Sequence, residues 1–283
     1  MIIGIDIGST TTKTVSVEDG ALTRKIKTRA QDAVTSAAGA LGKLLIENDI
    51  EISSIAGIAI TGAGASKIKN DIFGIPTRKV DEIQAIGTGG LFLAQARNPA
   101  ADPIVITNAG TGTAIIRAGN GGITHLGGSG VGGGTIYGLA KKLLPTADFS
   151  GIMELAQGGS LEQVELLLED ITDTEISFLG RQATAANFGK MLDSAGNSDI
   201  ALAILNMVYQ VIGMISVFAA RSAGVDRVVV TGNGGNNPVG KQILETISGM
   251  YGISFEYPQD AEYTTAVGAA LCWENAAGKP ARS

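Results

Sequence analysis

The feature that most constrains the fold is a pattern that occurs twice along the chain. An apolar strand runs into a short turn of glycine and hydroxyl residues, and a second apolar strand follows. The first copy covers residues 1–17, with its turn at 8–12, and the second covers residues 103–117, with its turn at 108–113. Such a turn typically joins two antiparallel strands. The repeat predicts two similar halves, each of which begins with a glycine-turn hairpin.

Glycine also gathers in two later clusters, and the chain has 40 glycines in 283 residues, about double the usual share. The segment 127–134 (GGSGVGGG) leads into a predicted helix, and backbone amides at a helix start bind anions. A flexible linker is the alternative, although apolar segments flank it on both sides. The loop 232–237 (GNGGNN) is predicted to contact adenine or ribose, or only to connect a strand to a helix.

Apolar patterning predicts an α/β protein with two domains. Residues 1–100 form the N-terminal domain, and residues 101–283 form the C-terminal domain with the later glycine loops. Residues 151–192 are expected to be helical and more polar than the rest. Helices are predicted over 33–46, 81–96, 135–144, 200–223, 242–250 and 263–273, and strands over 21–29, 55–60, 77–80, 227–231 and 253–257.

Composition excludes several classes of function. The chain has 21 Lys and Arg against 27 Asp and Glu, a net charge of -6, which argues against nucleic acid as a partner. A single Cys and a single His exclude a disulfide framework, and a zinc or iron–sulfur site rich in these residues. No apolar run is expected to reach the ~18–20 residues of a membrane span. We therefore expect a soluble, cytoplasmic protein without a membrane partner.

Asp6 stands between apolar residues at the end of the first predicted strand. A carboxylate there is unfavourable unless it is paired or faces a cleft, so one interpretation is that it holds a hydrated Mg²⁺ beside nucleotide phosphates. The other is a tight hairpin closed by an Asx-turn. Two such turns, one in each half, predict two domains that clamp one nucleotide, as in the actin-like ATPase and sugar-kinase architecture. A P-loop is disfavoured, because no Gly-Lys-Ser/Thr follows the glycines.

Asp81 and Glu82 follow a short predicted strand and open a helix. Acidic residues are common in the first helical turn for electrostatic reasons alone. The functional alternative is that one of them is a general base, which takes a hydroxyl proton during phosphoryl transfer.

A set of motifs, taken in chain order, resembles the type II pantothenate kinases over nearly the whole chain. The most specific are the VGGGT and TAANFG segments. The motifs are DIGSTTTK (6–13), VDE (80–82), NAGTGT (108–113), GGSGVGGGT (127–135), ATAANFGKML (183–192), TGNGG (231–235) and YTTAVGAAL (263–271).

The resemblance implies the acetate kinase/sugar kinase/Hsp70/actin fold, with ATP in the interdomain cleft. It also implies transfer of the ATP γ-phosphate to pantothenate, the first step of coenzyme A synthesis. Glu82 is then the base, Asp6 the Mg²⁺-associated carboxylate, and Thr184, Ala185 and Tyr257 part of the pantothenate pocket. The residues expected at ATP are Gly8, Ser9, Thr10, Thr11, Thr12, Lys13, Asn108, Gly110, Thr111, Gly112, Thr113, Gly130, Gly132, Gly133, Gly134, Gly232, Asn233 and Gly234.

The resemblance further implies a homodimer formed through long helices, with the apolar segment 200–223 as the candidate contact and part of the pantothenate pocket supplied by the second subunit. From the residues alone, that segment is equally well a core helix. Feedback by coenzyme A or an acyl-CoA is an open possibility.

One position departs from the family pattern: His125 stands where the family carries an Arg beside the substrate, and histidine cannot form the bidentate hydrogen bonds of a guanidinium. A weaker pantothenate kinase, a kinase of a pantetheine-like or sugar substrate, a regulator that binds ATP or acyl-CoA, and a strand-end histidine without a role all remain open. An activating ATPase for a reductase is disfavoured, because the lone Cys272 does not provide a cluster site.

Overall fold

A mixed five-stranded sheet forms the first half of the molecule. The computed structural model describes residues 1–174 and 180–277. Its first sheet has the order β3-β2-β1-β4-β5, in which β1 pairs antiparallel with β2 and parallel with β4. The strands are β1 (Ile2–Ile7), β2 (Thr11–Glu18), β3 (Ala21–Arg29), β4 (Gly57–Thr61) and β5 (Thr77–Lys79). Every residue of β1 is buried, as expected for a strand covered on both faces.

The second half repeats this topology. Its sheet has the order β12-β11-β6-β7-β8, in which β6 pairs antiparallel with β7 and parallel with β11. The strands are β6 (Ile104–Ala109), β7 (Thr113–Gly119), β8 (Gly122–Ser129), β11 (Arg227–Thr231) and β12 (Ser254–Glu256). The predicted repeat of strand, glycine turn and strand is therefore confirmed, and it extends to the whole sheet.

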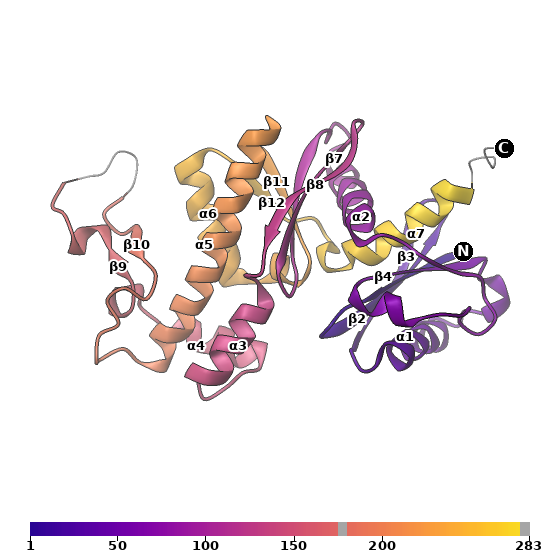
Figure 1. The fold of residues 1–283 in the computed structure, drawn as a ribbon, viewed down its shortest axis with the longest axis horizontal. Helices are drawn as coiled ribbons and strands as arrows, with labels where there is room; N and C mark the ends of the chain where they lie inside the picture. The colour runs from indigo at the N-terminus through magenta and orange to yellow at the C-terminus, as the bar shows by residue number, and fades with distance from the viewer. Residues whose placement is uncertain (175–179, 278–283) are drawn as a thin grey trace.

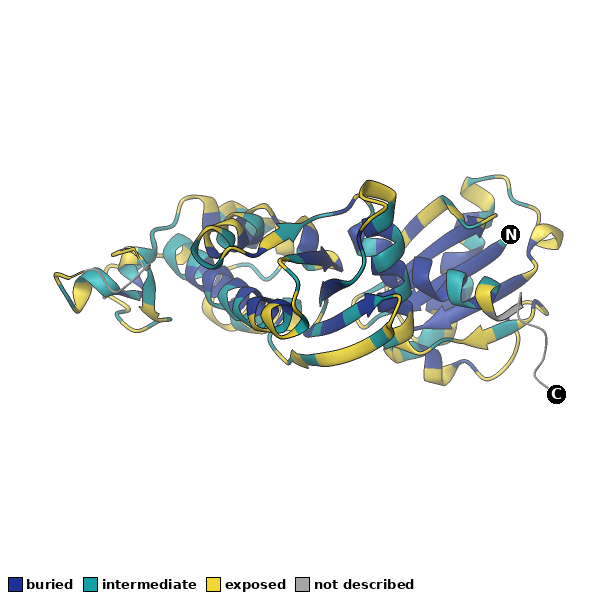
Figure 2. Ribbon diagram, turned by 90° about the horizontal axis from the view of Figure 1, so that it is seen from above, coloured by how far each residue is buried: buried dark blue, intermediate teal, exposed yellow. Residues whose placement is uncertain are grey.

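Helices cover both faces of each sheet (Figures 1 and 2). On the first sheet, α1 (Ala33–Glu47) packs in one core and α7 (Thr264–Ala277) in the other. On the second sheet, α2 (Glu82–Arg97) and α5 (Asn197–Ala223) take the corresponding places. The C-terminal helix α7 thus returns to the N-terminal sheet. The domain boundary near residue 100 falls between α2 and β6 and stays a prediction.

Helices α2 and α7 pack against each other between the two sheets, and glycines bring their backbones into contact. A Cβ atom on Gly268 would lie 1.8 Å from the Ala85 carbonyl oxygen, and one on Gly89 would lie 2.0 Å from the Thr264 carbonyl oxygen. No side chain larger than hydrogen fits at either position without moving a helix. Gly89 of α2 and Gly268 of α7 are therefore required by the packing of these two helices.

Helix α5 is long and apolar enough to cross a membrane, with a mean hydropathy of 2.0 in its most apolar window. The expectation that no apolar run reaches this length is therefore wrong. However, 61% of that window is buried inside the protein, where it packs against α3 (Gly133–Leu143), α4 (Phe149–Gln157) and α6 (Pro238–Tyr251). Its hydropathy is that of a core helix.

The segment 151–192 differs from its prediction. Only residues 151–157, which are most of α4, are α-helical there. The other described residues form turns, short 3-10 helices and a small two-stranded sheet of β9 (Leu166–Leu167) and β10 (Thr184–Ala186). The helical prediction is wrong for the described residues after 157, because Gly158 ends α4 and the amides of residues 190–192 donate to carbonyls of residues 163 and 164 rather than along a helix. Residues 175–179 of this segment lie outside the described residues.

Candidate active site

The two glycine turns face each other and line one cavity of about 470 Å³ between the sheets. The cavity is also lined by the residues that follow β4 and β11, and by the start of α2. It therefore collects most of the predicted nucleotide-binding residues and both predicted acids. These are Asp6, Gly8, Ser9, Thr10, Thr11, Lys13, Glu82, Asn108, Gly110, Thr111, Gly112, Thr113, Gly232 and Asn233.

The two turns leave equivalent amides unused. The Gly8 amide donates to the Thr11 carbonyl (3.2 Å) and the Gly110 amide to the Gly112 carbonyl (2.9 Å), so the first glycine closes each turn. The next two amides, Ser9 and Thr10 in one turn and Thr111 and Gly112 in the other, donate to no protein acceptor within residues 1–174 and 180–277. Successive free amides of this kind form an anion-binding concavity.

Asp6 lies at the base of this cavity and is only 8% exposed. Burial raises its pKa to about 6, against the opposing effect of Lys13, while Glu82 raises it further. The Lys13 ammonium lies 3.9 Å from the carboxylate, and burial lowers the pKa of this lysine. Both charges are thus held in a poorly solvated place that has room for a further cation and for phosphate oxygens.

Gly62, directly after β4, brings the backbone against Asp6. Its φ of +84° belongs to the left-handed region, and a Cβ atom here would lie 2.5 Å from Asp6 Oδ1. This position therefore needs glycine for two reasons, backbone conformation and close approach. The result is a wall of backbone that fixes the Asp6 carboxylate toward the cavity.

Glu82 is the first residue of α2, and Asp81 caps the helix through its side chain, which accepts from the Gln84 amide (3.0 Å). The two acids thus have different roles: Asp81 caps the helix, and Glu82 lines the cavity. Partial burial, and then the charge of Asp81, raise the pKa of Glu82. Since its side chain still reaches water, it can exchange a proton with solvent.

The third glycine segment is arranged differently from its prediction. Residues up to Ser129 belong to strand β8 rather than to a loop. The amides at the start of α3 are already used: Gly133 donates to the Gly110 carbonyl and Gly134 to the Thr111 carbonyl, each at 2.9 Å, and Gly132 donates to Thr135 Oγ1 at 3.2 Å. This helix start supports the second turn and does not present these three amides to an anion.

A second cavity, of about 460 Å³, adjoins the first and shares Thr10, Gly110, Thr111 and Asn233 with it. Its walls are mostly apolar and aromatic, with contributions from α3, α5 and the loop after β11. It contains the predicted residues Gly133, Gly134, Asn233 and Gly234. An apolar cavity joined to a phosphate-sized polar one has the form of a nucleotide site, base at one end and phosphates at the other.

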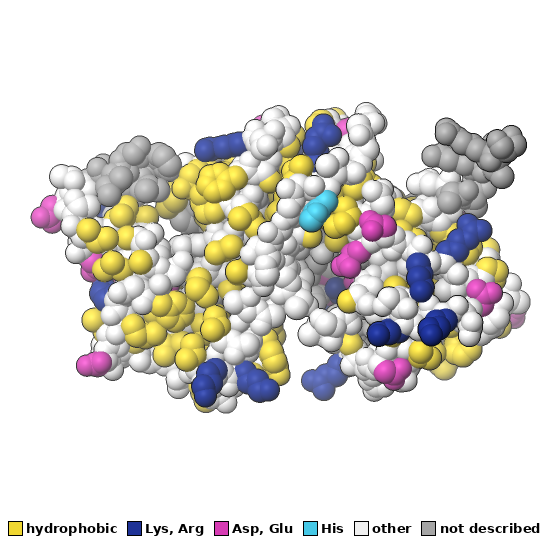
Figure 3. Space-filling view, in the orientation of Figure 1, with side chains coloured by type: hydrophobic (Ala, Val, Ile, Leu, Met, Phe, Trp, Pro, Cys, Tyr) yellow, Lys and Arg dark blue, Asp and Glu magenta, His cyan; other side chains and the backbone are white. Residues whose placement is uncertain are grey.

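Some predicted residues lie outside both cavities. Thr12 is fully buried, and Gly130, Gly132, Ala185 and Tyr257 line neither cavity. Strand β8 carries His125 at an exposed position, and the histidine is visible at the surface in Figure 3. The hydroxyl of Tyr257 is buried and has no hydrogen-bond partner among the described residues.

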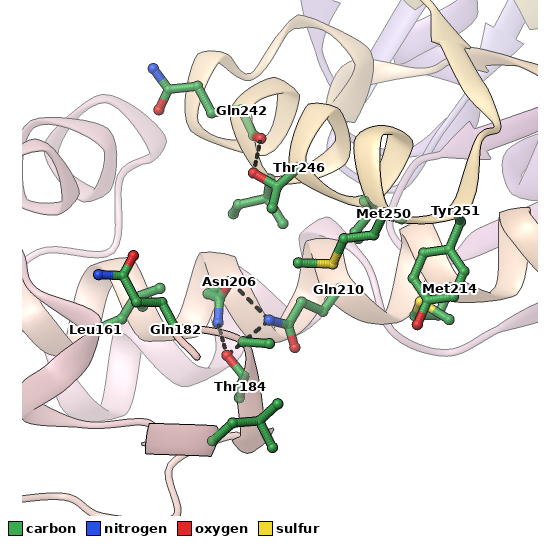
Figure 4. A pocket seen from close by; sticks show the side chains of 14 residues that line it. Leu161, Gln182, Thr184, Asn206, Gln210, Met214, Gln242, Thr246, Met250 and Tyr251 are labelled. Atoms are coloured by element: carbon green, nitrogen blue, oxygen red, sulfur yellow. Dashed lines mark hydrogen bonds between the residues drawn. The ribbon is translucent and has the colours of Figure 1, made fainter. Parts of the chain in front are cut away.

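Thr184 lines a third cavity, of about 400 Å³, which shares no residue with the other two. Figure 4 shows its hydroxyl oxygen accepting from Asn206 Nδ2 (3.3 Å) and Gln210 Nε2 (3.0 Å) of α5. With both lone pairs used, the Thr184 proton is free to donate to a ligand. All side chains that line this cavity are uncharged. The neighbouring Asn187 of the TAANFG motif donates to the buried Glu165 (3.0 Å).

The structure adds residues to the cleft that the sequence did not indicate. Tyr209 of α5 lines the apolar cavity and donates its hydroxyl to the Gly234 carbonyl (2.9 Å). Lys27 and Glu262 form an ion pair at the edge of that cavity. A lone tyrosine in an apolar helix looks like core, and no local pattern links residues so far apart.

Solved structures with the same fold support this two-sheet architecture. The activator of the 2-hydroxyisocaproyl-CoA dehydratase from Clostridium difficile, with bound ADPNP, matches all of this chain and 99% of its own, with 18% identity and a TM-score of 0.66. A ROK family glucokinase from Streptomyces griseus, in complex with glucose and AMPPNP, matches 96% and 98%, with 13% identity and a TM-score of 0.56. The fold is therefore that of the actin-like ATPases, as predicted.

Sequence comparison identifies the family. The type II pantothenate kinase of Bacillus thuringiensis subsp. konkukian (strain 97-27) is 30% identical over 239 residues, 82% of each chain. That of Staphylococcus aureus (strain USA300) is 28% identical over 277 residues, 95% of this chain and 98% of its own. The family model Fumble matches residues 25–269. The chain therefore belongs to the Fumble family and is a homologue of the type II pantothenate kinases.

Proposed function

We propose that this protein transfers the γ-phosphate of ATP to pantothenate and releases 4′-phosphopantothenate, the first step of coenzyme A biosynthesis, in the cytoplasm. The observation that carries the proposal is the shared cavity in which four free turn amides face Asp6 and Glu82. In a member of the Fumble family, this arrangement supports phosphoryl transfer between bound nucleotide and a small alcohol.

ATP would place its triphosphate against the two turns and its base in the adjoining apolar cavity. The amides of Ser9, Thr10, Thr111 and Gly112 would bind phosphate oxygens, and Lys13 would add a positive charge beneath them. Gly8, Gly110, Gly133 and Gly134 close and brace the turns. Gly232, Asn233 and Gly234 would contact the nucleoside by backbone, because they link the two cavities.

Asp6 fits a magnesium site beside the phosphates. Its carboxylate is buried at the base of the cavity, and Lys13 at 3.9 Å only partly compensates it. Mg²⁺ takes one or two carboxylates, waters and phosphate oxygens, and when bound it neutralises charge on the triphosphate. The chain itself would supply Asp6 directly, and the Gly62 wall would keep that carboxylate oriented.

Glu82 would act as the general base. Its raised pKa makes the carboxylate a better proton acceptor than an ordinary glutamate. It would take the proton from the primary hydroxyl of pantothenate as the oxygen attacks the γ-phosphorus. The P–O bond to ADP then breaks, and the proton passes to solvent. The two turns hold the transferring phosphate in line, which is the main requirement of this chemistry.

Pantothenate would lie between two subunits of a homodimer. Thr184 belongs to a cavity that shares no residue with the Glu82 cavity, and α5 and α6 stand between β10 and the first sheet (Figure 1). Within one chain the two sets of residues are therefore separate. The surface of the half that contains α5 carries clustered hydrophobic side chains (Figure 3), and Phe218 of α5 is 59% exposed. A second copy packed there would bring Thr184, Ala185 and Tyr257 to Glu82.

His125 motivates the second candidate, which is a kinase for a related acceptor or a weak kinase that binds acyl-CoA. On exposed strand β8, this imidazole can donate one hydrogen bond to a substrate carboxylate, where a guanidinium donates two parallel ones, one to each oxygen. A neutral acceptor without the pantothenate carboxylate, such as pantetheine, has less need for a cation. The uncharged cavity at Thr184 is also compatible with such a ligand.

A coupled assay of ADP release tests the proposal, with Mg·ATP and pantothenate, pantetheine, N-acetylglucosamine or no acceptor. We expect turnover that depends on pantothenate and is absent in Glu82→Gln. Turnover with pantetheine alone would favour the second candidate. No turnover with any acceptor, in protein that binds ATP, would contradict a kinase function toward this class of alcohol.

A further inference from the structure

The apolar nucleotide cavity contains one pair of charged side chains. Lys27 on β3 and Glu262 in the 3-10 turn Ala261–Tyr263 before α7 are its charged lining residues within the described chain. Lys27 Nζ donates to Glu262 Oε2 at 2.6 Å. The pair joins the edge strand of the first sheet to the loop that follows the second sheet, at the rim of the cavity.

The position of this pair relative to the phosphate cavity determines which part of a nucleotide it meets. Thr10, in the turn before β2, lines both cavities. Glu262 is near enough to Lys13 to raise the pKa of that lysine. Aromatic and apolar side chains, such as Tyr137 and Ile136, line the rest of the cavity. Lys27 stands opposite Lys13 in the β2–β3 register, and Lys13 lines the phosphate cavity. The pair therefore lies close to the phosphate cavity, where the ribose would connect base to phosphates.

The chemistry of a carboxylate indicates which part of the nucleotide Glu262 would contact. An ionised carboxylate only accepts hydrogen bonds and repels phosphate, so in a nucleotide site it is suited to the sugar hydroxyls, as in dinucleotide-binding folds. Lys27 offsets its charge, and Oε1 accepts no hydrogen bond among the described residues. The Glu262 side chain is 19% exposed, so a ligand that covers it has to satisfy that free oxygen.

We propose that Glu262, held in place by Lys27, accepts a hydrogen bond from a ribose hydroxyl and selects ribonucleotides over deoxyribonucleotides. This rests on the proposed function in that the cleft binds ATP, but it does not depend on which alcohol is phosphorylated. Lys27 acts as a positioning residue: it fixes the carboxylate and limits its repulsion of the α-phosphate.

Calorimetric titration without an acceptor tests this on the full-length protein, with Mg²⁺ complexes of ATP, 2′-deoxyATP, 3′-deoxyATP and GTP. We expect the wild type to bind ATP about tenfold more tightly than at least one deoxynucleotide, the ratio of one charge-assisted hydrogen bond. Glu262→Ala should lose that ratio and bind ATP about tenfold more weakly. Lys27→Met should weaken ATP binding and reduce the ratio without reversing it.

Glu256→Gln is the matched control. Glu256 also pairs with a cation, Arg227, at 3.7 Å, but lines neither cleft cavity, so this variant should keep the full ribose preference. Equal binding of ATP and both deoxynucleotides by the wild type, or a preference that survives Glu262→Ala, would overturn the assignment. So would a Glu262→Ala effect that is confined to the choice between ATP and GTP, because the carboxylate would then read the base.

The failure of this proposal is distinguishable from failure of the kinase function. Ribose selection without turnover of any acceptor would contradict only the kinase function, and turnover without ribose selection would contradict only the assignment of Glu262. Where turnover occurs, Glu262→Ala should raise KM for ATP and leave kcat within about twofold of wild type, since a contact made equally in ground and transition states changes KM alone.

Discussion

The hydroxyl oxygens of Ser9 and Thr111 lie 2.8 Å apart, so the tips of two turns separated by 102 residues touch inside the cleft. Each turn leaves two backbone amides free. The contact therefore joins four donors from both halves of the molecule into a single anion-binding surface.

Breaking this contact should weaken nucleotide binding specifically. Ser9→Ala removes one neutral hydrogen bond, which contributes about 0.5–1.5 kcal/mol, so KM for ATP should rise about two- to tenfold while KM for pantothenate stays the same. Steady-state kinetics measure both constants. Ser53→Ala, which removes an exposed hydroxyl bonded to Glu51, is the control. An unchanged KM for ATP in Ser9→Ala would mean that the contact is only structural.

Glu82→Gln should lower kcat by about 10²–10⁴-fold, the usual contribution of a general base, while the affinity for ATP stays within about twofold. Asp81→Asn is the matched control, because asparagine caps helices as well as aspartate does and the Gln84 amide keeps its acceptor. Rapid-mix kinetics measure the turnover rate, and calorimetry measures the affinity for ATP. Parental turnover in Glu82→Gln would exclude it as the base.

Activity should fall as the pH is lowered through about 6. Burial raises the pKa of Asp6 to about 6, so below that pH the group is mostly neutral and loses its attraction for a cation. Because a metal ion favours the ionised form, a higher Mg²⁺ concentration should move the midpoint of the acidic limb of kcat/KM to lower pH. Profiles of kcat/KM against pH at two Mg²⁺ concentrations test this. A midpoint that does not move would mean that Asp6 does not bind the metal ion.

Gly62→Ala should damage the site more than the backbone strain alone explains. Gly62 and Gly74 both have positive φ, +84° and +76°, but a Cβ atom at Gly74 meets nothing within 4 Å. Each alanine should cost about 1–3 kcal/mol of stability through backbone strain at a positive φ. Only Gly62→Ala should also displace Asp6 and lower kcat, by at least about tenfold. Urea unfolding and steady-state kinetics give the stability and the kcat of the two variants. Equal kcat values in both would show that Gly62 has no role in catalysis.

A mixture of two inactive variants should regain activity if the site is shared between subunits. In a heterodimer of Glu82→Gln and Thr184→Val, one site carries both changes and the other carries neither. After unfolding and refolding of an equal mixture, about a quarter of wild-type activity is expected, since half of the dimers are mixed. Each variant refolded alone is the control. A mixture no more active than its components would place Glu82 and Thr184 in one subunit's site, or Thr184 outside it.

The sequence allowed prediction of the parts of the fold that local patterns control. Strand, glycine turn and strand is a local arrangement, and both copies were found as predicted, with Asp6 and Glu82 in one cavity. The apolar segment 200–223 was also predicted as a helix, and α5 confirms it. In each case, neighbouring residues already contain the information on periodicity and turn conformation.

Long-range packing explains what the sequence did not indicate. The amides of Gly133 and Gly134 looked free for an anion, but the carbonyls that accept from them lie in a turn more than twenty residues earlier. Strand β8 was missed because glycines weaken strand propensity, while its pairing with β7 forms it. The Lys27–Glu262 pair had no local signal at all, because only the tertiary fold brings β3 to the loop before α7.

The crossing of α2 and α7 has a mechanical consequence. Gly89 and Gly268 put main chain directly against main chain at the centre of the molecule, between the sheets that carry the two turns. A rotation of one half against the other about this crossing would slide backbone over backbone at these two glycines, while the Thr88 and Cys272 side chains, which contact each other at 3.3 Å, would have to separate. The crossing can therefore serve as the pivot between the two halves. A methyl group added at either glycine would clash with the backbone of the facing helix and prevent the rotation.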